Sequence, residues 1–497
     1  MIDSNELTRK IKTPLNPRAA LIAYASEGDK NFFLEIRGID DRGNMTEGRP
    51  VTLEFMNTLV KEYSERHGTT PYGKIPDNLL YCDSRKGSER YVWYNPPHKR
   101  MMFFSTALKI ENAEYYLPGV IYEAGEHGMR IYALYKEYNG DGSIDPFMSY
   151  SNMCYKEFNQ GNKEILFARP DVSYDLYSQH SVPRGSRGQG GLGVTQELVD
   201  AFFMSNGLPA ITGYEPNGEP IINKASGYNE SGFSTQPDVR KTKWIEGDKD
   251  AKESNTENTI APAGTFNMYV NREPRFYVSV LYNGAWYRQS SRYVDFYYEG
   301  EDGRPASGSL WDAPQTGYLL RKRVHPETNI LNYSIPYRPG IICRLAEAYL
   351  NYAEALNEWA PEQTDEILKY VNLVRERAGI PQYGTGKDSN GLDKIPAPAD
   401  QTAMREAIRR ERRVEFNCEY AIRFDDIRRW KQIDILRGDF YGMNKFGTEK
   451  SCDKNNENAY FKRRVEITRA FSEKNYWFPI HQNQLDKNPN LRQLPKW

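Results

Sequence analysis

The chain has 497 residues, of which 39% are hydrophobic and 27% are charged, and its formal net charge is −1. This is the composition of a folded protein with a large core, and no run approaches the roughly 18 apolar residues that a membrane-spanning helix needs. The near-zero charge excludes binding that rests only on electrostatic attraction to nucleic acid or anionic lipid.

The first part of the chain, residues 1–190, mixes short apolar runs with turn-rich segments. The apolar runs predict helices at 18–25 and 53–66. An aromatic segment at 89–97 ends in two prolines, which is typical of a strand or an exposed loop. A glycine-rich passage at 183–193 then indicates a flexible connection.

Metal and disulfide sites are not predicted. The five cysteines never stand in a CxxC spacing, which argues against a disulfide framework and a structural zinc site. The six histidines show no HExxH motif. The segment 139–145 (NGDGSID) is loosely like a calcium loop but lacks the distant glutamate, so a plain turn is the preferred interpretation.

The middle part, up to residue 342, carries long polar stretches around short aromatic runs. Runs at 276–289 and 291–300 are rich in β-branched and aromatic residues, so we expect them to pair as strands. Long loops on a scaffold are where binding function tends to lie.

Aromatic residues make up 13% of the chain and include 36 tyrosines. A tyrosine ring is apolar and its hydroxyl forms hydrogen bonds, which suits a surface whose rings stack on the C–H faces of sugars. The candidate ligand contacts are large aromatics in loop-like contexts: Trp93, Tyr94, Tyr282, Trp286, Tyr287 and Trp311. Their neighbours with groups that can bond sugar hydroxyls are Asn95, Asn283, Arg288 and Asp312. The alternative is that Trp286 and Trp311 belong to the core of a small β-element.

The last part of the chain has a helical pattern, and we predict helices over 342–359, 364–381 and about 401–430. The second begins at Thr364, a capping residue followed by acids, and ends where Gly379 and Pro381 stop a helix. Two antiparallel helices of this size, with small residues at the crossing, resemble one tetratricopeptide repeat.

The third predicted helix is dense in charge. One interpretation is a solvated helix with its own ion pairs, such as Glu406–Arg410 and Glu419–Arg423. However, Glu411, Glu415 and Glu419 share one stripe at i, i+4 and i+8, where like charges repel. We therefore predict that cations from elsewhere in the fold face this stripe and form an internal ion-pair network. An active site is the alternative, which the absence of an accompanying histidine or nucleophile disfavours.

Four segments resemble the SusD/RagB family in order and spacing: RLAEAYLNYAEALNE (344–358), VNLVRERAGIP (371–381), AIRRERRVEFNCEYAIRFDDIRRW (407–430) and YWFPIHQNQLDKNPNLRQLPKW (476–497). Upstream segments at 194–209, 271–287 and 316–324 are also similar, so the resemblance covers roughly 190–497. Before that point only the regions near 129–140 and 163–170 are similar to the family.

The resemblance implies a mainly α fold: a tetratricopeptide-like helical repeat scaffold with a loop-rich insert containing short β-strands. The expected divisions are a divergent N-terminal helical part (1–190), a ligand-facing insert (191–342) and a C-terminal helical core (343–497). Family members are outer-membrane lipoproteins of Bacteroidetes that bind glycans at the cell surface and deliver them to a TonB-dependent SusC-like transporter. The resemblance implies no catalysis, no cofactor and no nucleic-acid partner, and the family's signal peptide and lipid anchor are not expected within this sequence.

Three alternatives remain open. A peptide-binding, RagB-like member of the family would use the same scaffold for another ligand. A helical-repeat scaffold would bind a protein in a concave groove and have no affinity for sugars. A glycoside hydrolase needs two carboxylates roughly 5–10 Å apart across a cleft, and no recognisable acid pair supports it.

Overall fold

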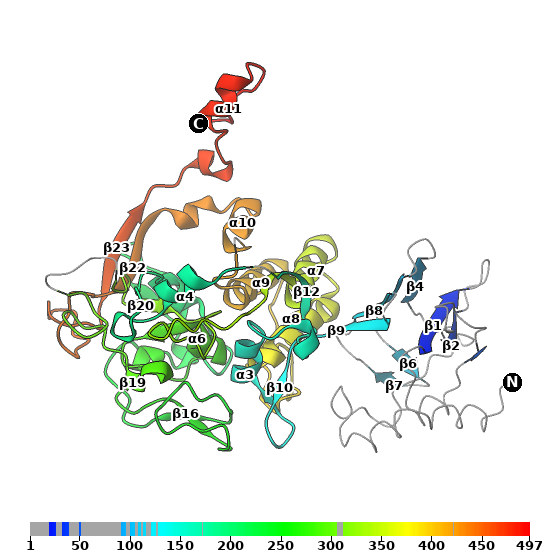
Figure 1. Cartoon of the computed structure of the whole chain (residues 1–497), viewed down its shortest axis with the longest axis horizontal. Helices are drawn as coiled ribbons and strands as arrows, with labels where there is room; N and C mark the ends of the chain where they lie inside the picture. Colours follow the sequence, from blue (N-terminus) through cyan, green and yellow to red (C-terminus); the bar gives the residue numbers. More distant parts are fainter. Residues whose placement is uncertain are drawn as a thin grey trace. The chain divides into compact units, whose positions relative to one another are not determined.

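The computed structural model describes residues 132–170, 172–305, 312–420 and 422–497 in full, together with the backbone of the strands between residues 19 and 132. The chain forms two compact units (Figure 1). The first consists of Met1–Leu134 with Lys163–Leu166, and the second of Tyr135–Asn162 with Phe167–Trp497.

The described elements of the first unit are antiparallel strands. One sheet has the order β1-β2-β3 (Ala19–Ala25, Phe32–Gly38, Arg49–Pro50). A second has the order β4-β5-β8-β9 (Tyr91–Asn95, Arg100–Phe104, Ile121–Gly125, Gly128–Tyr132). Strands β6 and β7 (Leu108–Ile110, Ala113–Tyr115) pair with each other. Strand β4 confirms the strand interpretation of the aromatic segment at 89–97.

The helix predicted at 18–25 is wrong, because this segment is strand β1. A short apolar run is compatible with either a helix or a strand, and periodicity alone does not separate them. Pairing decides the outcome here, since β1 runs antiparallel to β2 from Ala19 opposite Gly38 to Ala25 opposite Phe32. The helix predicted at 53–66 lies outside the described residues.

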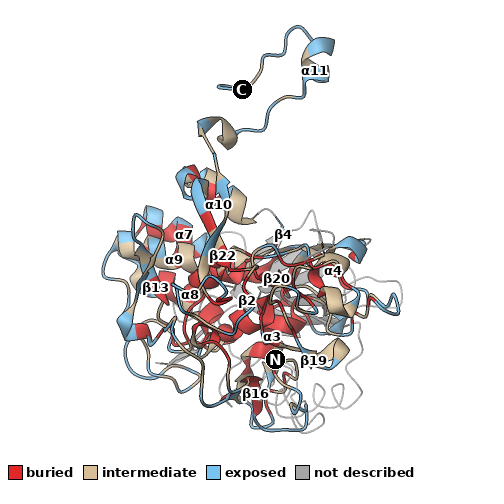
Figure 2. Ribbon diagram, turned by 90° about the vertical axis from the view of Figure 1, so that its left-hand side faces the viewer, coloured by how far each residue is buried: buried red, intermediate tan, exposed pale blue. Residues whose placement is uncertain are grey.

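The second unit encloses a hydrophobic core that is formed mainly by its short helices, strands and loops, to which two of its longer helices contribute Ala378 and Val414 (Figure 2). Helices α7 (Leu345–Trp359) and α8 (Thr364–Ala378) pack along each other, and α9 (Gln401–Glu415) packs against both. Short helix α3 (Pro146–Asn152) packs between α8 and α6 (Pro274–Ser279).

The remaining elements of this part of the chain are short. The helices are α4 (Asp175–Ser181), α5 (Gln196–Ala201), α10 (Ile422–Arg429) and α11 (Gln482–Lys487). The strands are β10 (Glu137–Tyr138), β11 (Ile144–Asp145), β12 (Ile165–Arg169), β13 (Ile211–Tyr214), β14 (Pro220–Ile222), β15 (Asp238–Arg240), β16 (Asn258–Ala261), β17 (Val280–Tyr282), β18 (Trp286–Tyr287), β19 (Arg292–Tyr293), β20 (Tyr318–Leu320), β21 (Gly340–Arg344), β22 (Gly438–Met443) and β23 (Arg463–Arg469).

The helices predicted at 342–359 and 364–381 are confirmed as α7 and α8, although strand β21 takes the first three residues of the earlier range. On α7, Tyr349 is buried, whereas Tyr352 is 45% exposed. Helix α8 ends as predicted, with Gly379 in the left-handed conformation (φ 69°).

The third predicted helix is divided into α9 and α10, and between them Cys418 and Tyr420 have positive φ angles of 57° and 41°. The last carbonyls of α9 bond to side chains instead of to a further helical turn. The Asn417 amide donates to the carbonyl of Val414 (2.7 Å), and the Tyr150 hydroxyl donates to that of Glu415 (2.7 Å). Such partners satisfy the free carbonyls at a helix end, which fixes the break.

The strand pairing predicted for 276–289 and 291–300 is correct only in part. Residues 274–279 form helix α6, with Pro274 in its first turn and every side chain buried, because proline favours a helix start and burial overrides strand propensity. Strand β17 pairs with β20 instead. Strands β18 and β19 do pair with each other and form a hairpin.

The glycine-rich passage at 183–193 is a packed loop and not the flexible connection that was predicted. The Gly185 N–H donates to Asp302 (3.0 Å), and the Gly190 N–H donates to the carbonyl of Val182 (3.1 Å). A Cβ at Gly188 would lie 2.0 Å from the carbonyl oxygen of Val182. The glycines therefore permit close approach of backbones rather than mobility.

Candidate functional site

The three acids of the predicted stripe are buried and faced by cations from other elements, as predicted, although Glu419 lies after the end of α9. Glu411, Glu415 and Glu419, together with Glu273 before α6, contact five basic side chains: Arg275, Lys322, Arg344, Arg375 and Arg377. The side chains of this charge network are at most 10% exposed. The cations come from α6, the segment after β20, β21 and α8, so the network ties these segments to α9.

The geometry of the charge network is that of close, shared pairs. Arg275 Nη1 lies 2.7 Å from Glu411 and 2.9 Å from Glu415, and Arg344 lies 2.7 Å from both Glu415 and Glu419. Burial alone would raise the pKa of Glu419, but Arg344 and Lys322 more than offset burial and hold that pKa at about 2. Glu419 is therefore an ionised part of the scaffold, and its carboxylate is not available to a ligand.

The candidate ligand surface is the hairpin of β18 and β19, with Ser291 in the left-handed conformation (φ 51°) before β19. Trp286 stands opposite Tyr293 in the register, and their rings meet edge to face with centroids 5.1 Å apart. The Trp286 ring is partly exposed and Tyr293 is 36% exposed. The pair therefore presents apolar ring surface to solvent, which is the chemistry that stacks on a sugar ring.

Charged and polar groups surround the ring pair. The Tyr293 hydroxyl donates to Asp248, and burial followed by this acceptor raises the pKa of Tyr293. Arg288, in the turn, donates to the carbonyl of Pro326 (3.0 Å) and lies 3.9 Å from Glu246. These groups can donate to and accept from the hydroxyl groups of a ligand that lies on the rings.

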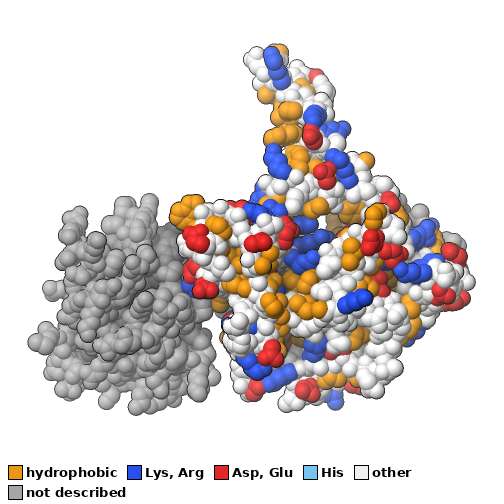
Figure 3. All heavy atoms as spheres, turned by 180° about the vertical axis from the view of Figure 1, so that it is seen from behind, with side chains coloured by type: hydrophobic (Ala, Val, Ile, Leu, Met, Phe, Trp, Pro, Cys, Tyr) orange, Lys and Arg blue, Asp and Glu red, His pale blue; other side chains and the backbone are white. Residues whose placement is uncertain are grey.

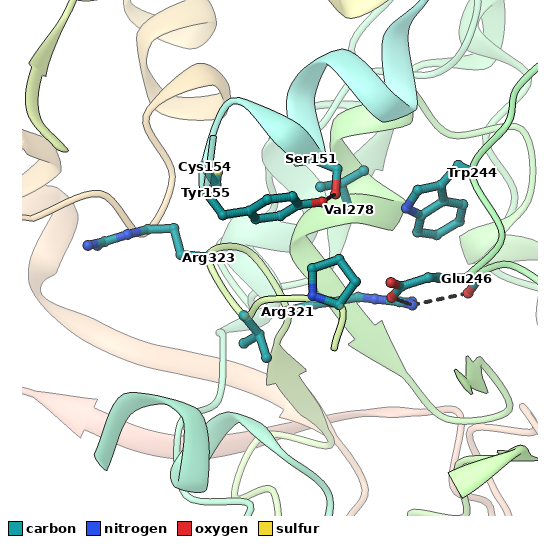
Figure 4. Close-up of a pocket in the computed structure, with 10 residues that line it drawn as sticks. Ser151, Cys154, Tyr155, Trp244, Glu246, Val278, Arg321 and Arg323 are labelled. Atoms are coloured by element: carbon teal, nitrogen blue, oxygen red, sulfur yellow. Dashed lines mark hydrogen bonds and ion pairs between the residues drawn. The ribbon is translucent and has the colours of Figure 1, made fainter. Parts of the chain in front are cut away.

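A small pocket lies beside the hairpin, because Glu246 and Pro326 also line it. Figure 4 shows Tyr155 and Trp244 on either side of it, and Arg321 donates to Glu246 at its edge (2.5 Å). Its volume of about 10 Å³ is room for about one water molecule. A sugar ring does not fit inside, so a glycan would have to bind on the surface of the hairpin.

The other predicted contacts lie in different surroundings. Tyr282 is 2% exposed in the core, with its ring stacked on Phe276, and Tyr287 is 8% exposed. Asn283 is also buried and accepts the N–H of Phe296 (2.8 Å). Tyr282 and Tyr287 are thus not the exposed rings that the sequence led us to expect, because both flanking strands turn these side chains inward.

For the remaining three predicted contacts, the structure does not describe the side chains. Trp93 and Tyr94, with neighbouring Asn95, belong to strand β4, and their side chains lie outside the described residues. Trp311 also lies outside the described residues, whereas its neighbour Asp312 is described and partly exposed. Of the six candidate aromatics, Trp286 is the one that the described part places on an accessible surface.

The sequence analysis missed Tyr293 and Asp248. A usable signal existed for Tyr293, because it stands in the second aromatic run, directly across a short turn from Trp286. No local signal existed for Asp248, which reaches the hairpin from a separate loop before β16.

The segment 139–145 is a plain turn, which is the interpretation that the sequence favoured over a calcium loop. Asp141 accepts from Ser143 (2.7 Å) and pairs with Lys241, while Asp145 caps α3 through the N–H of Met148 (3.1 Å). Within the described ranges no three His, Cys, Asp or Glu side chains converge as metal ligands.

The helices that the structure describes include none with the length and apolarity to cross a membrane.

The fold and the site together define a helical scaffold whose segments are joined by buried ion pairs. The scaffold carries loops and short strands, and one hairpin among them has an exposed pair of aromatic rings. The family model of the SusD family matches residues 153–497. The chain belongs to the SusD family. Its resemblance near 129–140 lies outside this match, in a region where residues 55–143 match the model of prokaryotic E2 family D.

Several solved structures are similar to this chain. A SusD-like protein of Bacteroides fragilis is 27% identical, with a TM-score of 0.48 over 73% of this chain and 59% of its own. A SusD-like carbohydrate-binding protein of the same species is 21% identical (TM-score 0.47, 71% and 58% covered). Surface glycan-binding protein A of Bacteroides thetaiotaomicron is 17% identical (TM-score 0.31, 69% and 54% covered).

This chain thus spans less than two thirds of the length of the solved structures that it matches. No curated protein is similar to it in sequence.

Proposed function

We propose that this protein binds glycans at the cell surface and delivers them, chemically unchanged, to a TonB-dependent SusC-like transporter in the outer membrane. A lipid anchor would hold the protein at the membrane. Membership of the SusD family supports this proposal. In this arrangement residues 191–342 supply the ligand-facing part and residues 343–497 the scaffold, in which α7 and α8 act as one tetratricopeptide-like repeat.

The observation that carries the proposal is the edge-to-face pair of Trp286 and Tyr293 on the hairpin, with Asp248 and Arg288 beside it. Exposed aromatic rings with polar neighbours suit a ligand that has both C–H faces and hydroxyl groups. The two carboxylates nearest the ring pair and the pocket are engaged, Glu246 by Arg321 and Asp248 by Tyr293. This engagement favours binding over acid–base chemistry.

The experiment is calorimetry of the full chain against a panel of host and plant glycans, with tryptophan fluorescence as a second readout. We expect Trp286→Ala and Tyr293→Ala to weaken binding of the best ligand about tenfold each, because loss of a stacked ring costs roughly 1–3 kcal/mol. Trp359→Ala is the matched control, since Trp359 is 83% exposed on α7, away from the hairpin.

Two results would contradict the proposal. Binding of peptides and of no glycan would favour the RagB-like alternative, and binding of neither would favour a protein-interaction scaffold. Equal losses for Trp286→Ala and Trp359→Ala would show that the hairpin is not the contact surface. Release of a shortened glycan over time would overturn the statement that the ligand leaves unchanged.

A further inference from the structure

Arg338 is a buried arginine whose charged group has no acceptor among the residues that the structure describes. It is 1% exposed, and all three of its guanidinium nitrogens are buried without a hydrogen-bond partner. Burial lowers the pKa of Arg338 to about 10, so the group remains charged at neutral pH. Because an unpaired buried charge is costly, Arg338 needs a partner that the described residues do not supply.

Arg272 shows how the same fold otherwise treats a buried arginine. It is 0% exposed, and its two terminal nitrogens donate to the backbone carbonyls of Val199 (2.5 Å), Phe202 (3.0 Å) and Met268 (3.2 Å). On the surface, acidic and basic side chains stand near one another over much of the face in Figure 3. Arg338 has neither kind of partner.

Two tyrosine rings hold Arg338 by its flat face. Its guanidinium carbon lies 3.6 Å from the centre of the Tyr174 ring and 4.9 Å from that of Tyr177. Backbone carbonyls fix both rings, because the Tyr174 hydroxyl donates to Pro339 (3.2 Å) and the Tyr177 hydroxyl to Lys322 (2.7 Å). Stacking uses the face of the guanidinium group and leaves the N–H groups at its edge free for an acceptor.

A second arginine lies over the same two rings. The guanidinium carbon of Arg323 is 5.6 Å from the centre of the Tyr174 ring and 5.5 Å from that of Tyr177. It also lies 4.9 Å from the centre of the Tyr420 ring. Its nitrogens donate to two neutral groups, the Tyr174 hydroxyl (3.1 Å) and the carbonyl of Cys418 (3.4 Å).

These side chains form one contiguous group, here called the arginine–tyrosine cluster: Tyr174, Tyr177, Arg323, Arg338 and Tyr420. Neither of its arginines forms an ion pair with a residue that the structure describes. Two like charges over shared rings repel each other, and an anion between them would remove this cost. The acidic residues of the charge network, faced by cations, follow the same rule with the opposite sign.

The carboxylate next to the cluster in the chain is already bound. Glu419 stands between Cys418 and Tyr420, and its two oxygens accept from Arg344 (2.7 and 2.9 Å) and from Lys322 (2.5 Å). It therefore supplies no hydrogen bond to the arginines of the cluster.

The same bonds correct two ion pairs that helical spacing suggests. Glu419 does not pair with Arg423, since Arg344 and Lys322 occupy it. Glu406 bonds to Arg409 (3.2 Å) and not to Arg410. The pairs Glu406–Arg410 and Glu419–Arg423 are therefore both wrong.

The backbone of the cluster is strained where it approaches solvent. Arg323, Cys418 and Tyr420 have positive φ angles of 66°, 57° and 41°. Residues other than glycine adopt this conformation at a cost, and they gather at ligand-binding positions. Exposure falls from Tyr420 (50%) through the partly exposed Arg323 and Tyr177 to Arg338 (1%). The cluster is thus open at Tyr420 and closed at Arg338.

The cluster is separate from the hairpin surface. Figure 4 shows Arg321 and Arg323 extending in opposite directions, with Arg321 reaching Glu246 at the edge of the pocket. Arg323 is therefore directed away from the carboxylate that its near neighbour binds.

We propose that Arg323 and Arg338, with the rings of Tyr177 and Tyr420 beside them, bind the carboxylate group of an acidic sugar. The planar guanidinium fork matches a carboxylate in two-point hydrogen bonding, and exposed ring surface suits the C–H face of a sugar. The carboxylate meets Arg323 first and reaches Arg338 when the side chain of Tyr420 rotates away, a fast motion for an exposed residue.

This inference rests on the proposed glycan-binding function. It adds the ligand class, glycans that contain uronic acids, and a second binding surface on the same unit.

The binding test compares two probes of equal length by calorimetry on the full chain: trigalacturonate and its fully methyl-esterified, neutral form. We expect the acidic form to bind at least tenfold more tightly. Arg323→Gln should weaken the acidic form about tenfold, since a hydrogen bond to a charged group contributes about a factor of ten or more. Arg338→Met should remove the difference between the two probes.

Thermal melting separates a binding role of Arg338 from a structural one. Arg338 has no acceptor in the free protein, so Arg338→Met should leave the melting temperature unchanged or raise it. Arg272→Met is the matched control, because it removes an equally buried arginine that bonds to three carbonyls, and it should lower the melting temperature by several degrees. Trigalacturonate should raise the melting temperature of the parent and not that of Arg338→Met.

Two further variants serve as binding controls. Arg405→Gln removes an arginine that already pairs with Glu358 (2.6 Å), and it should leave both affinities unchanged. Trp286→Ala alters the hairpin and should leave the preference for the acidic probe in place.

The results also separate this inference from the proposed function. Equal affinity for the two probes, an unchanged preference in Arg338→Met, or a loss of stability in Arg338→Met as large as in Arg272→Met would overturn the inference and leave glycan binding at the hairpin in place. Tighter binding of triglutamate than of trigalacturonate, with the same loss in Arg323→Gln, would overturn it in favour of an acidic peptide. Binding of no glycan at all would overturn both proposals.

Discussion

At the scale of single residues, Glu415 is the centre of the charge network. Its carboxylate accepts from Arg275 (2.9 Å), from Arg344 (2.7 Å) and from Arg377, and none of these side chains is more than 2% exposed. Solvent cannot take over these bonds when the acid is removed. Removing one partner of a buried ion pair leaves the other charge without a partner, and this is strongly destabilising. The loss is far larger than the stability that an intact pair adds relative to apolar residues of the same size.

We therefore expect Glu415→Gln to lower the free energy of unfolding by about 3–5 kcal/mol. The control is Glu358→Gln, which removes the partner of Arg405 at a position that is 45% exposed and should cost about 1 kcal/mol or less. Urea unfolding followed by circular dichroism measures both. Similar small losses for the two variants would show that the charge network contributes little to stability.

At the scale of elements, the end of α8 is fixed by a glycine. Gly379 has a φ of 69°, and the N–H of Ile380 donates back to the carbonyl of Arg375 (3.2 Å). A Cβ at Gly379 would lie 2.5 Å from Cγ of Pro146, at the start of α3. This position therefore needs glycine for two reasons, its backbone conformation and the contact between two helices.

Gly391→Ala separates these two reasons, because Gly391 has a similar φ of 79° but no atom within 4 Å of the added Cβ. We expect Gly391→Ala to cost about 1–2 kcal/mol from backbone strain. Gly379→Ala should cost about 1–3 kcal/mol more, since it also overpacks the contact with Pro146. Thermal or urea unfolding of the two variants gives the difference, and equal costs would contradict the importance of the helix contact.

The elements also show which features of the fold can be predicted from sequence. The ends of α8 follow from local signals, acids at its start and Gly379 after its last turn. The break after α9 does not, because it depends on Tyr150, a residue distant in sequence, which bonds to the carbonyl of Glu415. Helix α6 was mistaken for a strand because its aromatic residues favour strands, and only their complete burial explains the helix.

The residues of the candidate site also divide into those that the sequence can predict and those that depend on distant parts of the chain. Trp286 was chosen as a large aromatic in a loop-like context, and the structure places it, partly exposed, in the hairpin of β18 and β19. Asp248 was not chosen, because it approaches Tyr293 from another loop, and sequence spacing carries no information about that approach. The cations that face Glu411, Glu415 and Glu419 were predicted correctly from like charges at helical spacing. The identity of those cations, and the end of α9 before Glu419, are properties of the fold.

At the scale of the whole molecule, the charge network joins α6, the segment after β20, β21 and α8 to α9 and to Glu419 beyond it, so its ionisation affects the stability of the second unit. The surrounding cations lower the pKa values of Glu415 and Glu419, although burial alone would raise them. Burial raises the pKa of Glu273, which opposes this effect in part. Glu415 and Glu419 therefore favour the charged state, whereas Glu273 does not.

Stability should therefore fall in acid. Because the folded pKa of Glu419 is about 2 and its unperturbed value is 4.5, its contribution is complete above pH 4.5 and is lost as the pH falls toward 2. We expect the urea midpoint to drop between about pH 4.5 and pH 2, and Glu419→Gln to flatten this dependence. A midpoint that is constant over this range, or an unchanged slope in the variant, would contradict the assignment.

The shared carboxylates of the charge network also constrain how this family can change over time. Glu415 bonds to Arg275, Arg344 and Arg377 at once, so a substitution at Glu415 removes a carboxylate partner from all three arginines. Natural variants should either keep all of these residues or replace several together. Such a group would appear in an alignment of homologues as linked positions, inherited as a unit even where the surrounding loops diverge freely.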